Sequence, residues 1–388
     1  MNNEHPCVSK FISLCFSIDE LLGAGSIVDR GPRPANPPKI LQSVDDAIAN
    51  LSQLSQEATK STISHQLKRD MGLAISALVT VLQSSDNFNQ NSYVNNLEDI
   101  YQVKIEEIDQ GKILARFKEL HDFLHTAYPA RSLKSAFEQW REDNIVSADE
   151  YLNRLSAFVQ LGTQLASTEI LPSFLDKHDI NSIIGSLKGK YKIVDTKDNW
   201  QAYCIYEDEF KYTIEINGKY PLYQDQCALF AFHEVFPGHV AEAAIREYLY
   251  RKNEISSFYT LQLLNTPRNL LSEGLADYSL EYFKTSLTVS DYMGFVYDKV
   301  FTDVRHNLAI KILSGTMTKE EASEELVRNT WCSKEKAETA LLFAIKWKLY
   351  FPTYATGYYF VHNVVTRLQP NCWSGLYLSN DPASFIIR

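Results

Sequence analysis

The feature that most constrains this chain is a Pro-Gly pair that stands between two histidines in an otherwise helix-forming segment. In CALFAFHEVFPGHVAE, His233 is followed six residues later by His239. On an uninterrupted helix this spacing points the two rings about 120° apart. Pro237 cannot donate the helical hydrogen bond to the carbonyl of His233, and Gly238 tolerates backbone angles that redirect the chain. We therefore expect the helix to bend or widen here and to return His239 toward His233.

This segment also carries the residue types of a metal-dependent hydrolase. A His-Glu pair on a helix with a second His after it is typical of zinc hydrolases, in which imidazoles bind Zn²⁺ and the carboxylate activates water. We expect His233 and His239 as ligands and Glu234 as the general base. A third ligand should come from a later helix, and Glu273 in SEGLADY follows 34 residues after His239. Asp277 shares a helical face with Glu273 and can accept a hydrogen bond from a ligating imidazole.

The remaining patterns predict a mainly α (α+β) fold with a small β-sheet beside this helix. From about residue 40 to 168 apolar residues recur at helical spacing. Short strands are expected over 191–194, 203–206 and 210–217, where YTIEIN alternates apolar and polar residues. Helices resume near residue 224, and Thr318 and Ser333 are expected to cap two of them.

The same patterns suggest three regions within one intertwined globular unit. RGPRPANPP holds four prolines in nine residues and is expected to act as a linker. The expected regions are 1–38 as an N-terminal segment and linker, 39–188 as a helical region covering the cleft, and 189–388 as the metal-binding catalytic region.

The composition and charge of the chain limit the classes of partner and the cellular compartment that we expect. A formal charge of −10 argues against nucleic acid and against an anionic membrane surface. The chain has no apolar run of 18 residues, and its N-terminus lacks the basic start of a secretory signal. None of the six cysteines lies in a CxxC pair, so reduced thiols and a cytoplasmic location are expected. The expected partner is a peptide or small-molecule substrate.

HEVFPGH followed by EGLADY resembles the bacterial gluzincin-like family known as domain of unknown function 885. That family is marked by HExxPGHxxQ and, further on, EGWAxYxE. The resemblance extends over roughly residues 110–365, since MTKEEASEEL and the Tyr354-Ala355-Thr356-Gly357 segment are also similar to the family pattern. It implies a gluzincin-like helical metallohydrolase. By this resemblance His233, His239 and Glu273 are the metal ligands and Glu234 is the base.

The chain departs from the family pattern around the substrate pocket. Glu242 replaces the Gln of the first motif, and Leu275 and Leu280 replace the Trp and second Glu of the second motif. After Arg305 the family has an Asp and a His, where this chain has Ala309 and Leu313. The resemblance to the family therefore supports the assignment of the metal ligands better than any assignment of substrate-binding residues.

Other residues are candidates for supporting roles. Tyr354 and then Arg305 are the expected donors to the oxyanion of an attacked carbonyl. Glu242 is expected next to the metal ligands, or as a fourth ligand if the metal is not zinc. Glu215 and Asn217, on the strand before the active helix, are expected to line the substrate cleft.

Three functions remain open from the sequence. The first is a zinc-dependent hydrolase that cleaves an amide or peptide-type bond. The second is a metal-dependent tailoring enzyme for a specialised small molecule, with Fe²⁺ as an alternative because two imidazoles and one carboxylate also suit Fe(II). The third is a catalytically dead binding protein, against which the intact Glu234 argues.

Overall fold

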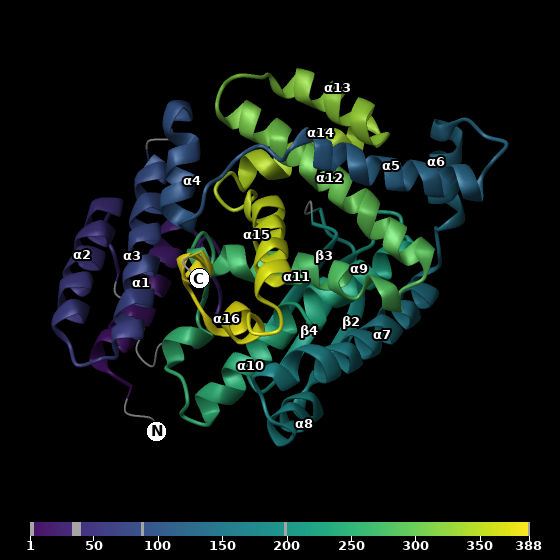
Figure 1. Cartoon of the computed structure of the whole chain (residues 1–388). Coiled ribbons are helices and arrows are strands. Elements are labelled where there is room, and N and C mark those ends of the chain that lie inside the picture. Colours follow the sequence, from purple (N-terminus) through teal and green to yellow (C-terminus); the bar gives the residue numbers. More distant parts are fainter. Residues whose placement is uncertain (1–3, 33–39, 87–88, 198–199, 387–388) are drawn as a thin grey trace. The chain divides into compact units, whose positions relative to one another are not determined.

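In the computed structural model the described residues are 4–32, 40–86, 89–197 and 200–386 (Figure 1). Helices account for 69% of the chain and strands for 7%, which confirms the mainly α fold with a small sheet. The chain forms two compact units that are interleaved in sequence. The first comprises residues 1–105, 243–272 and 374–388, and the second comprises residues 106–242 and 273–373.

Among the described residues, the first unit contains four helices that follow one another in sequence, a short antiparallel strand pair and parts of three further helices. Neighbouring helices of the series pack against each other. In the second helix of the series, Ser43 accepts a hydrogen bond from the amide of Asp46 at the N-terminus, and the buried residues recur at helical spacing. The elements are α1 (Pro6–Leu22), α2 (Val44–Lys60), α3 (His65–Asp86), α4 (Tyr93–Tyr101), β1 (Val28–Arg30) and β5 (Gln262–Leu263).

The second unit holds the small sheet and most of the longer helices. Its elements are α5 (Gln110–Ala127), α6 (Leu133–Asp143), α7 (Ala148–Leu165), α8 (Lys177–Ser186), β2 (Lys188–Val194), β3 (Ala202–Glu207), β4 (Lys211–Asn217), α9 (Cys227–Phe230), α12 (Val289–Leu313), α13 (Lys319–Thr330), α14 (Lys334–Lys346) and α15 (Thr353–Leu368). In the described part of the chain, three unit boundaries fall within the helices α10 (His239–Arg251), α11 (Pro267–Tyr282) and α16 (Trp373–Leu378).

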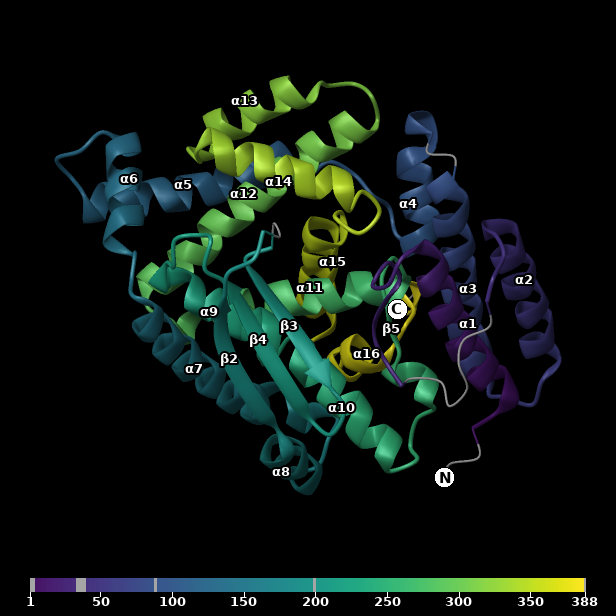
Figure 2. The same cartoon turned by 180° about the vertical axis from the view of Figure 1, so that it is seen from behind.

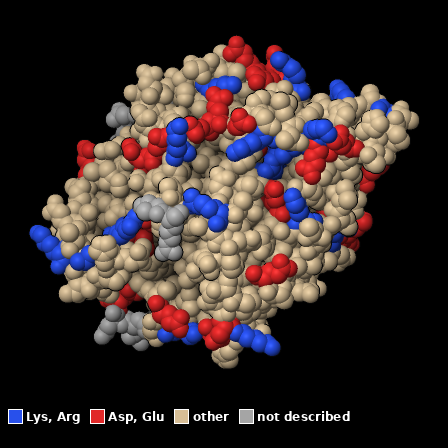
Figure 3. Space-filling model, in the orientation of Figure 1, with Lys and Arg blue, Asp and Glu red and all other residues tan. Residues whose placement is uncertain are grey.

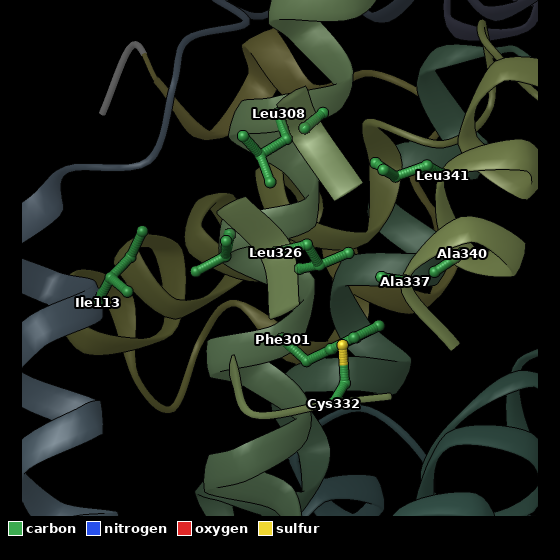
Figure 4. Packing of buried hydrophobic residues seen from close by; sticks show 10 residues of the cluster. Ile113, Phe301, Leu308, Leu326, Cys332, Ala337, Ala340 and Leu341 are labelled. Carbon is green, nitrogen blue, oxygen red and sulfur yellow. The ribbon is translucent and has the colours of Figure 1, made fainter. Parts of the chain in front are cut away.

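Helix α12 is the central element of the second unit. It packs against α5, α13, α14 and α15, and most of its side chains are buried. Figure 4 shows Phe301 and Leu308 of α12 meeting Leu326 of α13 and Ala337 and Leu341 of α14. Burial of one Leu or Phe side chain contributes about 1.5–3 kcal/mol. This cluster therefore fixes the separation of α12 and α14.

The sheet has the strand order β2–β4–β3, with β2 parallel and β3 antiparallel to β4 (Figure 2). In the central strand Tyr212, Ile214 and Ile216 are buried, as the alternation in YTIEIN predicts. α7 packs against β2, and β3 contacts residues 231–235, which follow α9. The sheet thus lies next to the segment that carries the first histidine, as expected.

Two further expectations about helix starts are confirmed. Thr318 and Glu321 form a reciprocal capping box at the start of α13, and Ser333 caps α14 through the amide of Lys336. Most of the Pro-rich segment lies outside the described residues. The boundaries expected after residues 38 and 188 are not where the two units divide, and that division into functional regions stays a prediction.

The surface charge, the hydropathy of the helices and the state of the cysteines bear on the expected partners and compartment. On the face shown in Figure 3, Lys and Arg side chains lie among Asp and Glu side chains. Within the described ranges, no helix has both the length and the hydropathy needed to cross a bilayer. All six cysteines are buried and free. The expectations about nucleic acid, membranes and compartment stay predictions.

Candidate metal centre

The first histidine lies on a widened helical turn. α9 runs directly into a π-helical turn, Ala231–Val235, which carries His233 and Glu234. The chain then turns, and the amide of Gly238 donates to the carbonyl of Phe232 at 2.9 Å before α10 begins. A Cβ atom at Gly238 would overlap the carbonyl oxygen of His233. Glycine is therefore required for this close approach, and the turn has the bent and widened form that the sequence predicts.

This turn brings the two imidazoles together. Nε2 of His233 and Nε2 of His239 lie 3.2 Å apart. The Glu273 carboxylate, on α11, reaches both rings, with Oε1 at 3.3 Å from Nε2 of His239 and Oε2 at 3.5 Å from Nε2 of His233. Ligands bound at about 2.0–2.1 Å to a tetrahedral Zn²⁺ lie about 3.3–3.4 Å apart. The separation of the two ring nitrogens is close to this value, and a different oxygen of the Glu273 carboxylate lies at a similar distance from each ring.

The Glu273 carboxylate gives an independent test of this fit. Oε1 accepts a hydrogen bond from Oη of Tyr350 at 2.6 Å. Oε2 is buried and has no hydrogen-bond partner among the described residues. A buried oxygen in this state costs about 1–3 kcal/mol, and a cation between the carboxylate and the two imidazoles would compensate it. The residues present therefore fit a divalent metal, although their geometry does not identify which one.

A chain of buried charges holds His233 in place. Nδ1 of His233 is 2.8 Å from Oδ1 of Asp277, and Oδ2 of Asp277 accepts from Nζ of Lys299 at 2.7 Å. The Lys299 side chain is 0% exposed. With the ring proton on Nδ1, donated to Asp277, Nε2 presents its lone pair to the cation position. Asp277 thus has the position expected from its spacing to Glu273.

Burial and the neighbouring charges act in opposite directions on the ionisation of His233 and Asp277. Burial opposes the charged form of His233, but the hydrogen bond to Asp277 and the charges of Glu234, Asp277 and Glu273 outweigh it and raise its pKa to about 10. Burial likewise opposes ionisation of Asp277, but Lys299 and His233 lower its pKa. A cation must displace the proton of His233 in order to bind, so binding is coupled to proton release.

Sequence reasoning missed Lys299 and Tyr350. Lys299 lies in a run of apolar residues on α12, and a lysine in such a run is a signal that a buried partner exists. Tyr350 lies four residues before the candidate Tyr354, within a Tyr-rich segment. Nothing in their spacing ties either residue to the HEVFPGH motif, because the contacts join parts of the chain far apart in sequence.

A pocket of about 190 Å³ in the second unit opens beside this centre. The π-helical turn contributes His233 and Glu234, and Glu234 offers an oxygen within 4.8 Å of ring nitrogens of both histidines. Tyr354 and Arg305 also line the pocket, so both expected oxyanion donors lie on its wall. Burial raises the pKa of Tyr354 well above its usual value, which keeps the phenol protonated as a donor.

Glu215 and Asn217 make contacts in and beside the sheet, and their expected place in the substrate cleft stays a prediction. Among the described residues that line the pocket, neither is present. Glu215 pairs with Lys192 across the β2–β4 ladder at 2.7 Å, and Asn217 is buried and donates to the carbonyl of Trp200. Both residues belong to the central strand of the sheet. The alternation of apolar and polar residues does not predict which strand is central. The segment that leads into β3, residues 200–202, lines the pocket instead.

Glu242 is buried on the first turn of α10, where its amide donates to the carbonyl of Gly238. This places it directly after the turn that joins the two histidines. Its role next to the ligands, like the catalytic roles of Glu234, Tyr354 and Arg305, stays a proposal.

Comparison with known proteins shows the fold alone. No family model matches the chain, and no curated protein matches it in sequence. A protein of Colwellia psychrerythraea, provisionally described as a lipoprotein, is similar over 89% of this chain and 69% of its own, at 12% identity and a TM-score of 0.55. A second provisional lipoprotein, of unknown function, from Shewanella oneidensis is similar over 88% and 72%, at 13% identity and a TM-score of 0.55.

An M32 carboxypeptidase from Deinococcus radiodurans R1 covers 96% of this chain and 87% of its own. Its identity is 10% and its TM-score is 0.34, which is too low to support an argument. The resemblance to the gluzincin-like family therefore rests on the motifs HEVFPGH and EGLADY.

Proposed function

We propose that this chain is a metal-dependent hydrolase that cleaves an amide-type bond, with Zn²⁺ as the ion that its donor set suits best. One observation carries the proposal: two imidazole nitrogens converge at 3.2–3.5 Å with a carboxylate, one oxygen of which has no hydrogen bond among the described residues. Glu234 follows directly in the chain and lines the adjoining pocket. A purely structural site would need no such base.

When bound, the divalent cation supplies a Lewis acid that polarises a carbonyl and lowers the pKa of a water molecule. Glu234 takes the proton of the attacking water and passes it to the leaving nitrogen. Tyr354 donates a hydrogen bond to the oxygen that gains charge. Asp277 and Lys299 hold the tautomer of His233, and Tyr350 orients the carboxylate of Glu273.

The size of the pocket favours a small substrate. Sites for drug-sized ligands are about 300–1,000 Å³, and this pocket is about 190 Å³. This supports the tailoring of a small molecule as the second candidate. Two imidazoles and one carboxylate also suit Fe(II), so metal identity is part of the test.

The test combines metal content with activity. Elemental analysis of the purified protein should find about one zinc per chain, and a panel of small amides and short peptides should include a substrate. Glu234→Gln should retain the metal and lose activity by about 10²–10⁴-fold. Glu320→Gln makes the same chemical change at an exposed position of α13 and should leave activity unchanged. Full activity in Glu234→Gln, or a folded protein that binds no metal, contradicts the proposal.

A further inference from the structure

The pocket beside Glu234 has a second charged wall, formed by one face of α12 and one face of α14. The wall carries Asp298, Thr302 and Arg305 from α12 and Lys336, Thr339 and Phe343 from α14. In each helix these residues recur three, four or seven positions apart, as on a single helical face. The metal centre and this wall share one small pocket, so a substrate that reaches Glu234 also meets the wall.

The packing of the unit fixes this wall. Phe301 and Ala340 line the pocket and also belong to the apolar cluster of Figure 4, which joins α12 to α14. Aromatic rings position the two cations as well. The Arg305 guanidinium lies 4.8 Å from the ring centre of Phe351, and Nζ of Lys336 lies 4.6 Å from that of Phe301.

Neither cation has a close acidic partner among the described residues, although the charge of Asp298 favours the charged form of both. In the part of the chain that the structure describes, Nε of Arg305 is buried without a hydrogen-bond partner, and neither Arg305 nor Lys336 forms an ion pair. Oη of Tyr220, on the same pocket, is also buried without a partner. Burial, with repulsion from Arg141, lowers the pKa of Lys336 to about 8, and burial lowers that of Arg305. A lowered pKa is expected of a positive charge that burial removes from water.

Asp298 is the acidic group of the wall and does not balance it. It lies on the same face of α12 as Arg305, and no ion pair joins it to either cation within the described residues. On this wall two positive charges stand against one carboxylate, whose own pKa is raised by burial. The other two carboxylates of the pocket, Glu234 and Asp277, lie at the metal centre, where Asp277 is paired with Lys299. The wall has a net attraction for an anion, and an Arg side chain favours the planar, two-oxygen geometry of a carboxylate.

We propose that Arg305 and Lys336 bind a free carboxylate of the substrate, so that the enzyme acts on small amides that carry such a group. This rests on the proposed hydrolase function and adds its substrate class. It also gives Arg305 a role in specificity in place of the oxyanion role expected from the sequence. Aromatic side chains on the pocket, among them Phe230 and Phe343, suit an apolar group on the other part of the substrate.

The experiment compares two probes of nearly equal shape, N-benzoylglycine and its neutral primary amide. Their dissociation constants are measured by calorimetry on Glu234→Gln protein, so that no turnover occurs. The measurement is made on both metal-loaded and metal-depleted samples, because a carboxylate can also bind the ion. We expect the acid to bind at least about tenfold more tightly than the amide in both samples, since one hydrogen bond to a charged group is lost in the amide.

Substitutions on the wall should shift the preference for the acid over the amide in opposite directions, depending on the charge that is removed. Arg305→Gln and Lys336→Gln should each reduce the preference for the acid about tenfold or more, and Asp298→Asn should increase it. Lys334→Gln makes the same chemical change as Lys336→Gln on an exposed part of α14 and should leave the preference intact. If Arg305→Gln fails to fold, the opposite shifts in Lys336→Gln and Asp298→Asn still decide the question.

Equal binding of acid and amide, or a preference that survives loss of both cations, overturns the carboxylate site. Tighter binding of phenyl phosphate than of N-benzoylglycine overturns the assignment to a carboxylate. The hydrolase proposal fails on separate evidence, which is a folded protein without metal or activity. If such a protein still bound the acid more tightly than the amide, the carboxylate site would be supported and the hydrolase proposal would be refuted.

Discussion

Substitution of Gly238 by alanine tests whether the Pro-Gly turn builds the metal centre. The added Cβ would overlap the carbonyl oxygen of His233 and would stand 2.6 Å from the carbonyl carbon of His233 and from the oxygen of Phe232. Non-bonded carbon atoms separate to about 3.5–4.0 Å, so the backbone must move by roughly 1 Å. Ligand distances in metal sites are held within about 0.2 Å. The movement is several times that tolerance.

We expect Gly238→Ala to weaken zinc binding by about 10–100-fold or more, by analogy with loss of a residue that orients a ligand. The overpacking should also lower the free energy of unfolding by about 1–3 kcal/mol. Competition with a chromogenic chelator measures the first quantity, and urea denaturation of the metal-free protein measures the second. Gly185→Ala is the matched control, because nothing lies within 4 Å of a Cβ at that position. Wild-type zinc affinity in Gly238→Ala would refute the reasoning.

Three further predictions concern buried polar groups of the second unit. Lys299→Met leaves the Asp277 carboxylate buried without its cation and should cost about 3–5 kcal/mol in urea denaturation; an unchanged midpoint contradicts this. Tyr350→Phe removes the donor to Glu273 and should weaken zinc binding about tenfold in the chelator assay, with little change in stability. His306 is buried, and its pKa is lowered to about 4. Stability should therefore fall as the pH drops from about 6.5 to 4, by about 3 kcal/mol, and His306→Gln should lose this part of the pH dependence.

The sequence predicted features that depend on local patterns. Alternation in YTIEIN identified the buried face of β4, and the Thr318 cap identified the start of α13. The Pro237-Gly238 break predicted a widened turn because it acts on the helix that contains it. The expectation that Glu273 approaches the two histidines followed from the usual layout of such metal sites, in which a later helix supplies the third ligand.

Features that depend on strand order and long-range packing could not be predicted. Period-two alternation does not say which strand is central, so the pairing of Glu215 with Lys192 across the β2–β4 ladder could not be predicted. Lys299 and Tyr350 reach the centre from helical segments with no spacing relation to the motif. The interleaving of the two units likewise depends on contacts between distant segments.

X-ray absorption at the metal edge of the purified protein tests the central claim most directly. The edge energy identifies the ion, and the account predicts zinc. The fine structure should show only nitrogen and oxygen neighbours at about 2.0–2.1 Å, with outer-shell scattering from two imidazoles. His233→Ala and His239→Ala should each remove one imidazole or the ion itself. A sulfur neighbour at about 2.3 Å, or an ion that stays unchanged in both variants, would contradict the assignment of the site.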